Sequence, residues 1–380
     1  MSRIRFTFRG RMEDIMINDF DGDALQAQIK RLSGTPRITA LQSAIEQADA
    51  AEAHYYRLFF RYQYMAELTF RDDPPKAIPV AMEFGPIFEE HPDVLGDIGV
   101  EAYLSTMEFA VDPMVSLPQI PISQWEALME QYQALVQRFN LGYRNYWLQR
   151  CQFYMYVDRE KAVTYFEKLW DTQRDDLSPC QACEHCQGIR MYLLMGDAQA
   201  ADKIALPLKQ KKISYCTDTP QKMCLPYLEF ALNQGDLKAA SPYAKQLRHM
   251  GYHDKGDLSY MGAIIRYYAY TDLNIATEIL AAGLPWTVGL WDQKMLYDFY
   301  KGAWTVLRQL KKMKDTIYLE MPGQFKLYRE DNIYSVKELE AWIYAQAADI
   351  CRRFDQRNGN NYFAEDFALA QKDLTSDRIL

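Results

Sequence analysis

The apolar positions of this chain recur with a spacing that matches pairs of helices. Between Asp158 and Asp272 the same pattern returns every 36–39 residues, and a similar pattern follows Asp73, about two repeats earlier. In each repeat an aspartate separates two apolar helical stretches. An alanine follows that aspartate by four residues, and the seventh and eleventh positions are apolar or aromatic, apart from Gly283. Offsets of 4, 7 and 11 fall on one face of an α-helix. The pattern therefore predicts an all-α chain of helix pairs. The expected turns lie at Asp73, Asp158, Asp197, Asp236 and Asp272.

The alanines predict close contacts between helices. A small residue at one fixed place in every unit is expected where two helices approach each other closely. Two of the turns are Gly-Asp pairs, at Gly196–Asp197 and Gly235–Asp236. The five alanines are Ala77, Ala162, Ala201, Ala240 and Ala276.

This combination of turn and small residue resembles the tetratricopeptide-repeat (TPR) superfamily over roughly residues 50–290. The resemblance implies a right-handed superhelical solenoid of helix-turn-helix repeats. The chain departs from the family in two ways. Its repeats are longer than the usual 34 residues, and the small residue of the first helix is mostly replaced. The replacing residues are Met65, Arg150, Ile189, Leu228 and Ile264.

The repeats divide the chain into four expected parts. Residues 1–38 form an atypical N-terminal segment, 39–315 the helical repeats, 316–357 a C-terminal capping segment and 358–380 a polar tail, partly ordered at best. Ser335 and Glu338 form a capping box, which predicts a helix start. We expect that helix to cover the exposed end of the repeats, as terminal units must.

Five of the seven cysteines cluster, which indicates a metal site. Cys180, Cys183 and Cys186 are spaced by two residues, and C-x2-C is the common half-site for tetrahedral zinc. The repeat register places 180–186 and 216–224 at the entries to neighbouring first helices. We expect a structural zinc ion, because a full set of protein ligands leaves no open position for catalysis. Free buried thiols and a redox switch are the alternatives. The expected ligands are Cys180, Cys183 and Cys216, with Cys224 or Cys186 as the fourth and His185 as an outside candidate.

Composition and charge limit the classes of partner that we expect. Apolar residues make up 49% of the 380 residues and charged ones 25%, as in folded proteins. The net charge of −8 argues against a nucleic-acid partner. No run of 18 apolar residues and no signal-peptide pattern occur, so we expect no membrane partner and a cytoplasmic location.

Enzyme motifs are missing from the sequence. It contains no G-x-x-x-x-G-K-[ST], no G-x-G-x-x-G and no H-E-x-x-H. We therefore assign no catalytic or nucleotide-binding residue, and a non-enzymatic role is favoured.

The TPR resemblance implies a protein- or peptide-binding scaffold or adaptor whose first helices line a concave groove. The paired Lys and Asn of the family's carboxylate-clamp receptors are missing, so an apolar peptide or a partner's helix is expected rather than an acidic C-terminus. The alternatives are a peptide-responsive bacterial regulator or phosphatase-like repeat protein, and an enzyme on a helical scaffold. The implied groove residues are Tyr62, Gln63, Trp147, Tyr154, Arg190, Leu193, Glu229, Asn233, Ile265 and Tyr268.

Overall fold

The computed structural model describes residues 20–71 and 73–374, and this part of the chain is all-α apart from one small ribbon. Its α-helices are α1 (Gly22–Ile29), α2 (Thr35–Ala50), α3 (His54–Arg71), α4 (Ala77–Glu90), α5 (Gly99–Val111), α6 (Ile122–Phe139), α7 (Tyr143–Tyr154), α8 (Arg159–Asp171), α9 (Gln181–Leu194), α10 (Ala198–Lys209), α11 (Thr219–Asn233), α12 (Leu237–His249), α13 (Leu258–Thr271), α14 (Leu273–Gly283), α15 (Gln293–Leu310), α16 (Val336–Asn358) and α17 (Tyr362–Gln371). The short 3₁₀-helices are η1 (Pro74–Lys76), η2 (Gly96–Ile98), η3 (Asp112–Ser116), η4 (Lys255–Asp257) and η5 (Leu284–Thr287). The ribbon pairs β1 (Thr316–Tyr318) with β2 (Ile333–Ser335) in antiparallel register.

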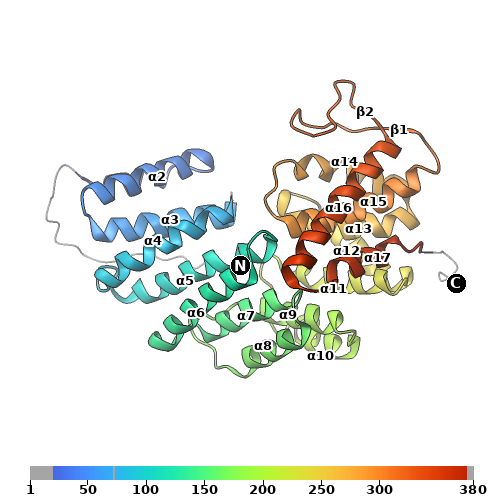
Figure 1. The fold of residues 1–380 in the computed structure, drawn as a ribbon. Helices are drawn as coiled ribbons and strands as arrows, with labels where there is room; N and C mark the ends of the chain where they lie inside the picture. Colours follow the sequence, from blue (N-terminus) through green and yellow to red (C-terminus); the bar gives the residue numbers. More distant parts are fainter. Residues whose placement is uncertain (1–19, 72, 375–380) are drawn as a thin grey trace.

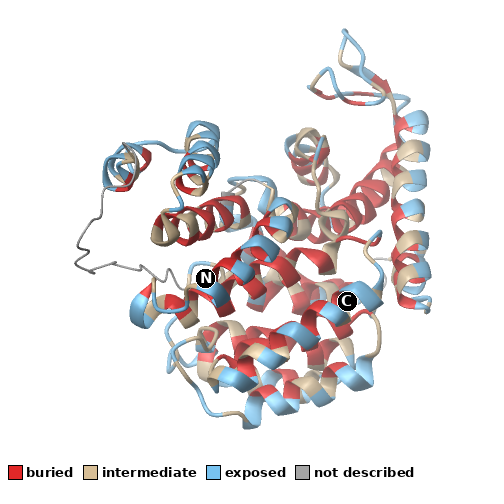
Figure 2. Cartoon of the chain, turned by 60° about the vertical axis from the view of Figure 1, so that its left-hand side comes forward, coloured by how far each residue is buried: buried red, intermediate tan, exposed pale blue. Residues whose placement is uncertain are grey.

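The helices pack in sequential pairs, so the described fold is helical-repeat-like. Helix α7 packs on α8, α9 on α10, α11 on α12 and α13 on α14. The first helices of successive pairs also touch, because α9 contacts α11, α11 contacts α13 and α13 contacts α15. In Figure 1 the pairs follow an arc from α2–α4 through α7 and α8 to α13–α15. Buried residues gather on the faces that the helices turn toward one another (Figure 2).

Four of the five predicted turns are built by aspartate caps. The side chains of Asp158, Asp197, Asp236 and Asp272 each accept a hydrogen bond from a backbone N–H in the first turn of α8, α10, α12 and α14. The preceding Gly196 has a φ of +81°, a left-handed conformation that glycine adopts without a side-chain clash.

The Asp73 turn is built differently. Asp73 precedes η1, whose first residue is Pro74, and the aspartate makes no side-chain capping hydrogen bond. Helix α4 begins only at Ala77. Pro74 and Pro75 have no backbone N–H that the Asp73 side chain could cap. The chain therefore forms a 3₁₀ turn before α4 begins.

The predicted alanines lie in the contacts between helices. Ala77, Ala201, Ala240 and Ala276 are fully buried, and Ala162 is 1% exposed. The burial predicted for Ala201 and Ala240 is therefore confirmed.

The C-terminal region differs from the expected polar tail. Ser335 caps α16 by accepting the N–H of Glu338 at 3.3 Å, as the capping box predicts. Beyond Asn358, however, the chain forms α17 and buries Phe363 and Phe367, an apolar pair four residues apart on one helical face.

Helix α16 also does more than cover an end. The guanidinium of Arg357 donates to the backbone carbonyls of Met114, Val115 and Leu117, and Asn358 donates to the carbonyl of Tyr156. The C-terminal helices are therefore tied to the middle of the arc.

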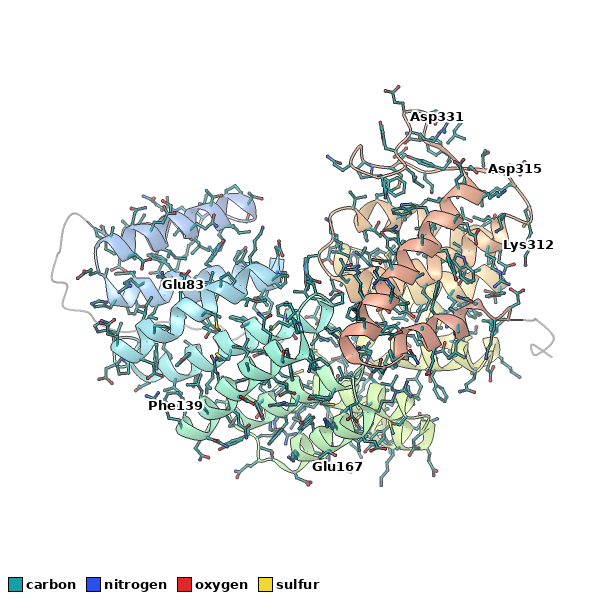
Figure 3. The ribbon with its side chains drawn as sticks, viewed as in Figure 1. Glu83, Phe139, Glu167, Lys312, Asp315 and Asp331 are labelled. Carbon is teal, nitrogen blue, oxygen red and sulfur yellow. The ribbon has the colours of Figure 1, made fainter. Side chains whose placement is uncertain are left out.

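Charged side chains such as Glu83, Glu167 and Lys312 are exposed on the outside of the molecule (Figure 3). None of the helices described here has the length and apolar character needed to cross a membrane.

Candidate functional site

Two neighbouring helix starts bring three cysteines together. Cys180 is the N-cap of α9, and its sulfur accepts the backbone N–H of Cys183 at 3.3 Å. Cys216 lies just before α11, and its N–H donates to the hydroxyl of Thr219 at 2.9 Å. The packing of α9 on α11 joins the two segments, as the repeat register predicts.

The geometry of this three-cysteine cluster, Cys180, Cys183 and Cys216, can hold a metal ion. Their sulfur atoms all lie within 4.8 Å of one another, and those of Cys183 and Cys216 are 3.5 Å apart. Tetrahedral zinc with bonds of about 2.3 Å needs sulfur atoms about 3.8 Å apart. A movement of roughly 1 Å or less would thus bring each pair to that separation. All three residues are only half-buried, so an ion can reach them.

Hydrogen bonds make one thiol of the cluster acidic. Burial opposes ionisation of Cys216, but hydrogen bonds with Thr219 and Cys183 outweigh it and lower its pKa to about 6. Burial raises the pKa of Cys183, while the ammonium of Lys222, 3.9 Å from its sulfur, opposes that rise. The cluster therefore contains a thiolate near neutral pH, and thiolates are the form that binds metals.

The candidates for a fourth ligand lie outside this group. The thiol of Cys186 is buried and contacts the carbonyl of Thr219 at 3.8 Å. Cys224 is also buried, and burial raises its pKa to about 11. The Nδ1 atom of His185 lies 2.7 Å from the carbonyl of Ile204, so this imidazole faces α10. Among the described residues, three thiols alone form the cluster.

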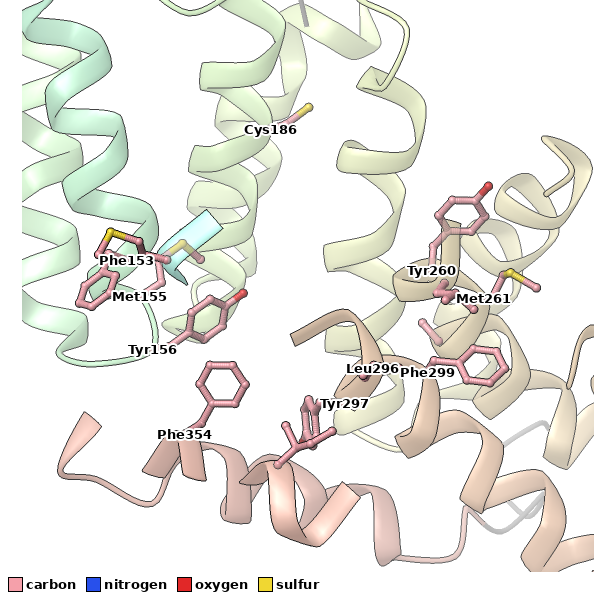
Figure 4. Close-up of a cluster of buried hydrophobic side chains, with 14 of the residues drawn as sticks. Phe153, Met155, Tyr156, Cys186, Tyr260, Met261, Leu296, Tyr297, Phe299 and Phe354 are labelled. Carbon is pink, nitrogen blue, oxygen red and sulfur yellow. The ribbon is translucent and has the colours of Figure 1, made fainter. Parts of the chain in front are cut away.

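A second candidate site is a cavity of about 380 Å³, here called the inner-face cavity. Its walls come from the turn after α7, from α9 and α11, from α15 and from α17. In Figure 4, Tyr156 and Tyr297, which belong to different walls, both lie near Phe354 of α16. The cavity therefore lies where the C-terminal helices meet the first helices of the repeats.

Two ion pairs line the cavity on its α15 side. The ammonium of Lys294 lies 2.6 Å from the carboxylate of Asp298, one turn further along α15. The ammonium of Lys301 lies 2.7 Å from the carboxylate of Asp366 on α17. Asp366 also accepts a hydrogen bond from the hydroxyl of Tyr297. These pairs satisfy four of the charges in the cavity wall and attach α17 to α15.

Two further charges in the wall are not paired with each other. Arg190 of α9 donates to the hydroxyl of Tyr156 and lies over its ring, and the described residues offer it no carboxylate within ion-pair distance. No described residue makes an ion pair or a hydrogen bond with the carboxylate of Glu229 on α11. Burial raises the pKa of Glu229, and the nearby cations Lys301, Lys294 and Arg190 oppose this without contacting it. Arg159 and Glu365 also line the cavity, but both are exposed at its rim. Away from the rim, the described wall therefore presents one cation, Arg190, and one anion, Glu229, without a charged partner.

The implied groove residues divide into two groups. Arg190, Leu193, Glu229 and Asn233 line the inner-face cavity together. The others lie in contacts between helices. Gln63 accepts from Arg37 of α2, Tyr154 donates to Glu126 of α6, and Trp147 stacks on Tyr165 of α8.

The remaining members of that second group are buried. Tyr62 packs against Phe109 of α5, Tyr268 lies beneath Arg248 of α12, and Ile265 is fully buried. The side chains of this second group are thus engaged in contacts within the described chain.

Sequence reasoning missed the charges of α15 and α17. Lys294, Asp298 and Lys301 lie four and seven residues apart, a spacing that places them on one helical face. That signal was available in the sequence. Their partner Asp366 could not be named, because it lies 65 residues from Lys301 and outside the repeat register.

Comparisons with family models, with curated proteins and with solved structures found no match. The TPR resemblance therefore rests on the residue register alone.

Proposed function

We propose that this chain is a protein- or peptide-binding scaffold. In this proposal its helix pairs form a TPR-like solenoid, and its inner face binds a helical or extended segment of a partner. The three-cysteine cluster holds a structural zinc ion that joins two neighbouring repeats.

The main support for the proposal is the packing of α17 against other helices of the chain. This ten-residue helix lies on the first helices of the repeats through side-chain contacts with three of them. Asn233 of α11 contacts Asp366, Arg266 of α13 donates to the carbonyl of Leu369, and Lys301 of α15 pairs with Asp366. The surface formed by α11, α13 and α15 thus already accommodates a helix. Helix-in-groove recognition of a partner uses the same kind of contact.

The cysteine geometry supports the zinc part of the proposal. Half-buried thiols at the starts of α9 and α11 offer soft sulfur ligands, which zinc accepts. An ion bound there would cross-link α9 to α11.

Site-specific photo-crosslinking tests the binding surface. A benzophenone amino acid replaces Met195, which is 45% exposed at the rim of the inner-face cavity. The matched control carries it at Leu206 of α10, which is 48% exposed and does not line the cavity. In a lysate of its own organism, we expect the Met195 position to capture a discrete protein or peptide that the Leu206 position does not. Identical products from both positions would contradict the proposed surface.

A further inference from the structure

The inner-face cavity has the size and walls of a small-molecule site. Its volume of about 380 Å³ lies within the range of ligand pockets, roughly 300–1,000 Å³. Its lining mixes apolar groups, such as Leu193, Pro226 and Phe230, with the ring of Tyr297 and a few charges. Ligand sites have this composition because apolar walls supply affinity and a few polar groups fix the orientation.

The charges that remain unpaired define the chemistry of a ligand. Arg190 and Glu229 occupy equivalent positions in successive repeats, 39 residues apart, on the adjacent helices α9 and α11. Both line the cavity, yet they form no ion pair with each other. Both side chains are only partly buried, so they remain accessible from the cavity. A ligand that supplies an opposite charge to each of them would be favoured, because hydrogen bonds between charged groups are the strong ones.

The neighbouring charges favour a ligand that carries both signs over a purely anionic or cationic one. The cations Lys294 and Lys301 are already neutralised by Asp298 and Asp366. A simple anion would satisfy Arg190 and leave Glu229 without a partner, and a simple cation would do the reverse. A molecule with one negative and one positive group satisfies both.

We propose that the inner-face cavity binds a small zwitterion of the free α-amino-acid class, with its carboxylate on Arg190 and its ammonium on Glu229. The guanidinium can bind a carboxylate through two parallel hydrogen bonds. The ligand's side chain then lies against the apolar wall formed by Leu193, Pro226 and Phe230. This inference does not depend on the scaffold proposal, because a molecule inside the cavity needs no partner protein.

Calorimetric titration of the full chain with the twenty L-amino acids, each at up to about 10 mM, tests the proposal. We expect at least one of them to bind. Its N-acetyl and its C-amide derivatives should each bind at least about tenfold more weakly, because each lacks one of the two charges. Inorganic phosphate and succinate, which carry no ammonium, should not bind.

Two variants assign the contacts. Glu229→Gln is nearly isosteric and should weaken binding of the amino acid at least about tenfold while leaving the melting temperature close to wild type. Arg190→Met should have the same effect on binding. Glu167→Gln is the control, because Glu167 of α8 is exposed and does not line the cavity, and it should bind as wild type.

The proposal is overturned if none of the twenty amino acids binds. It is also overturned if the blocked derivatives bind as well as the free amino acid, if phosphate or succinate binds in its place, or if Glu229→Gln binds as wild type. Should Arg190→Met fail to fold, Glu229→Gln and the blocked derivatives still decide the question. Failure of the Met195 crosslink with intact amino-acid binding would reject the scaffold proposal alone.

Discussion

At the scale of single residues, small side chains set the distances between helices. Ala240 of α12 is fully buried, and its equivalents in the other units are at most 1% exposed. Helices α13 and α15 approach closely, because a Cβ atom added to Gly302 would lie 2.0 Å from the carbonyl oxygen of Gly262. Larger side chains at such positions would push backbones apart, because the interior is close-packed.

Ala240→Leu should therefore lower the free energy of unfolding by about 1–3 kcal/mol, the typical cost of overpacking. Ala239→Leu on the same helix is the matched control, because Ala239 is exposed. Urea denaturation followed by circular dichroism measures both. Equal stability of the two variants would show that the register of α12 is wrong.

At the scale of elements, α17 is held by a buried charge. Burial opposes ionisation of Asp366, but the charge of Lys301 and hydrogen bonds from Lys301 and Tyr297 outweigh it and lower its pKa well below the usual value. A carboxyl group with a lowered pKa stabilises the folded state when it is ionised. The docking of α17 is thus coupled to pH.

Asp366→Asn should destabilise the chain by about 3–5 kcal/mol at neutral pH, because it leaves the ammonium of Lys301 buried without its partner. The advantage of the wild type should be complete above the unfolded pKa of about 3.9 and should fall as pH drops from there toward the lowered folded pKa. Hydrogen exchange of α17 and urea denaturation from pH 7 to pH 3 measure this. Glu365→Gln, at the adjacent exposed position, should change neither the exchange rate nor the free energy of unfolding. A stability difference between wild type and Asp366→Asn that does not vary with pH would reject the ionic contribution.

At the scale of the whole molecule, the three-cysteine cluster lies at the middle of the arc. It links the start of α9 to the start of α11. Helix α9 also contacts α8 of the preceding pair, and α11 contacts α13, which in turn contacts α15. In a repeat architecture each unit contacts its neighbours, so a cross-link at the centre stabilises both halves.

Protein purified without added metal should contain about one zinc ion per chain, and chelation should lower the melting temperature of the whole array. Cys183→Ser should abolish the zinc. Cys224→Ser is the matched control and should retain it, because Cys224 lies outside the cluster. Protein without zinc but with a Cys183–Cys216 disulfide would instead support a redox pair.

The sequence by itself determined the local structure of the repeats. Asp197 and Asp236 cap helices because an aspartate side chain bonds the N–H groups of the turn that follows it, an interaction within three residues. Ala201 and Ala240 are buried because their position in the repeat fixes the helical face. The same register brought Cys183 and Cys216 together, since repeats stack at a constant offset.

Only the tertiary structure decided where the C-terminal helices lie. The mostly polar segment beyond Asn358 contains an apolar pair, Phe363 and Phe367. These two side chains are buried only because α17 packs against the rest of the chain. The pairing of Lys301 with Asp366 and the cavity around Arg190 follow from that placement. Contacts between residues far apart in sequence depend on how whole elements pack, and no local periodicity records that choice.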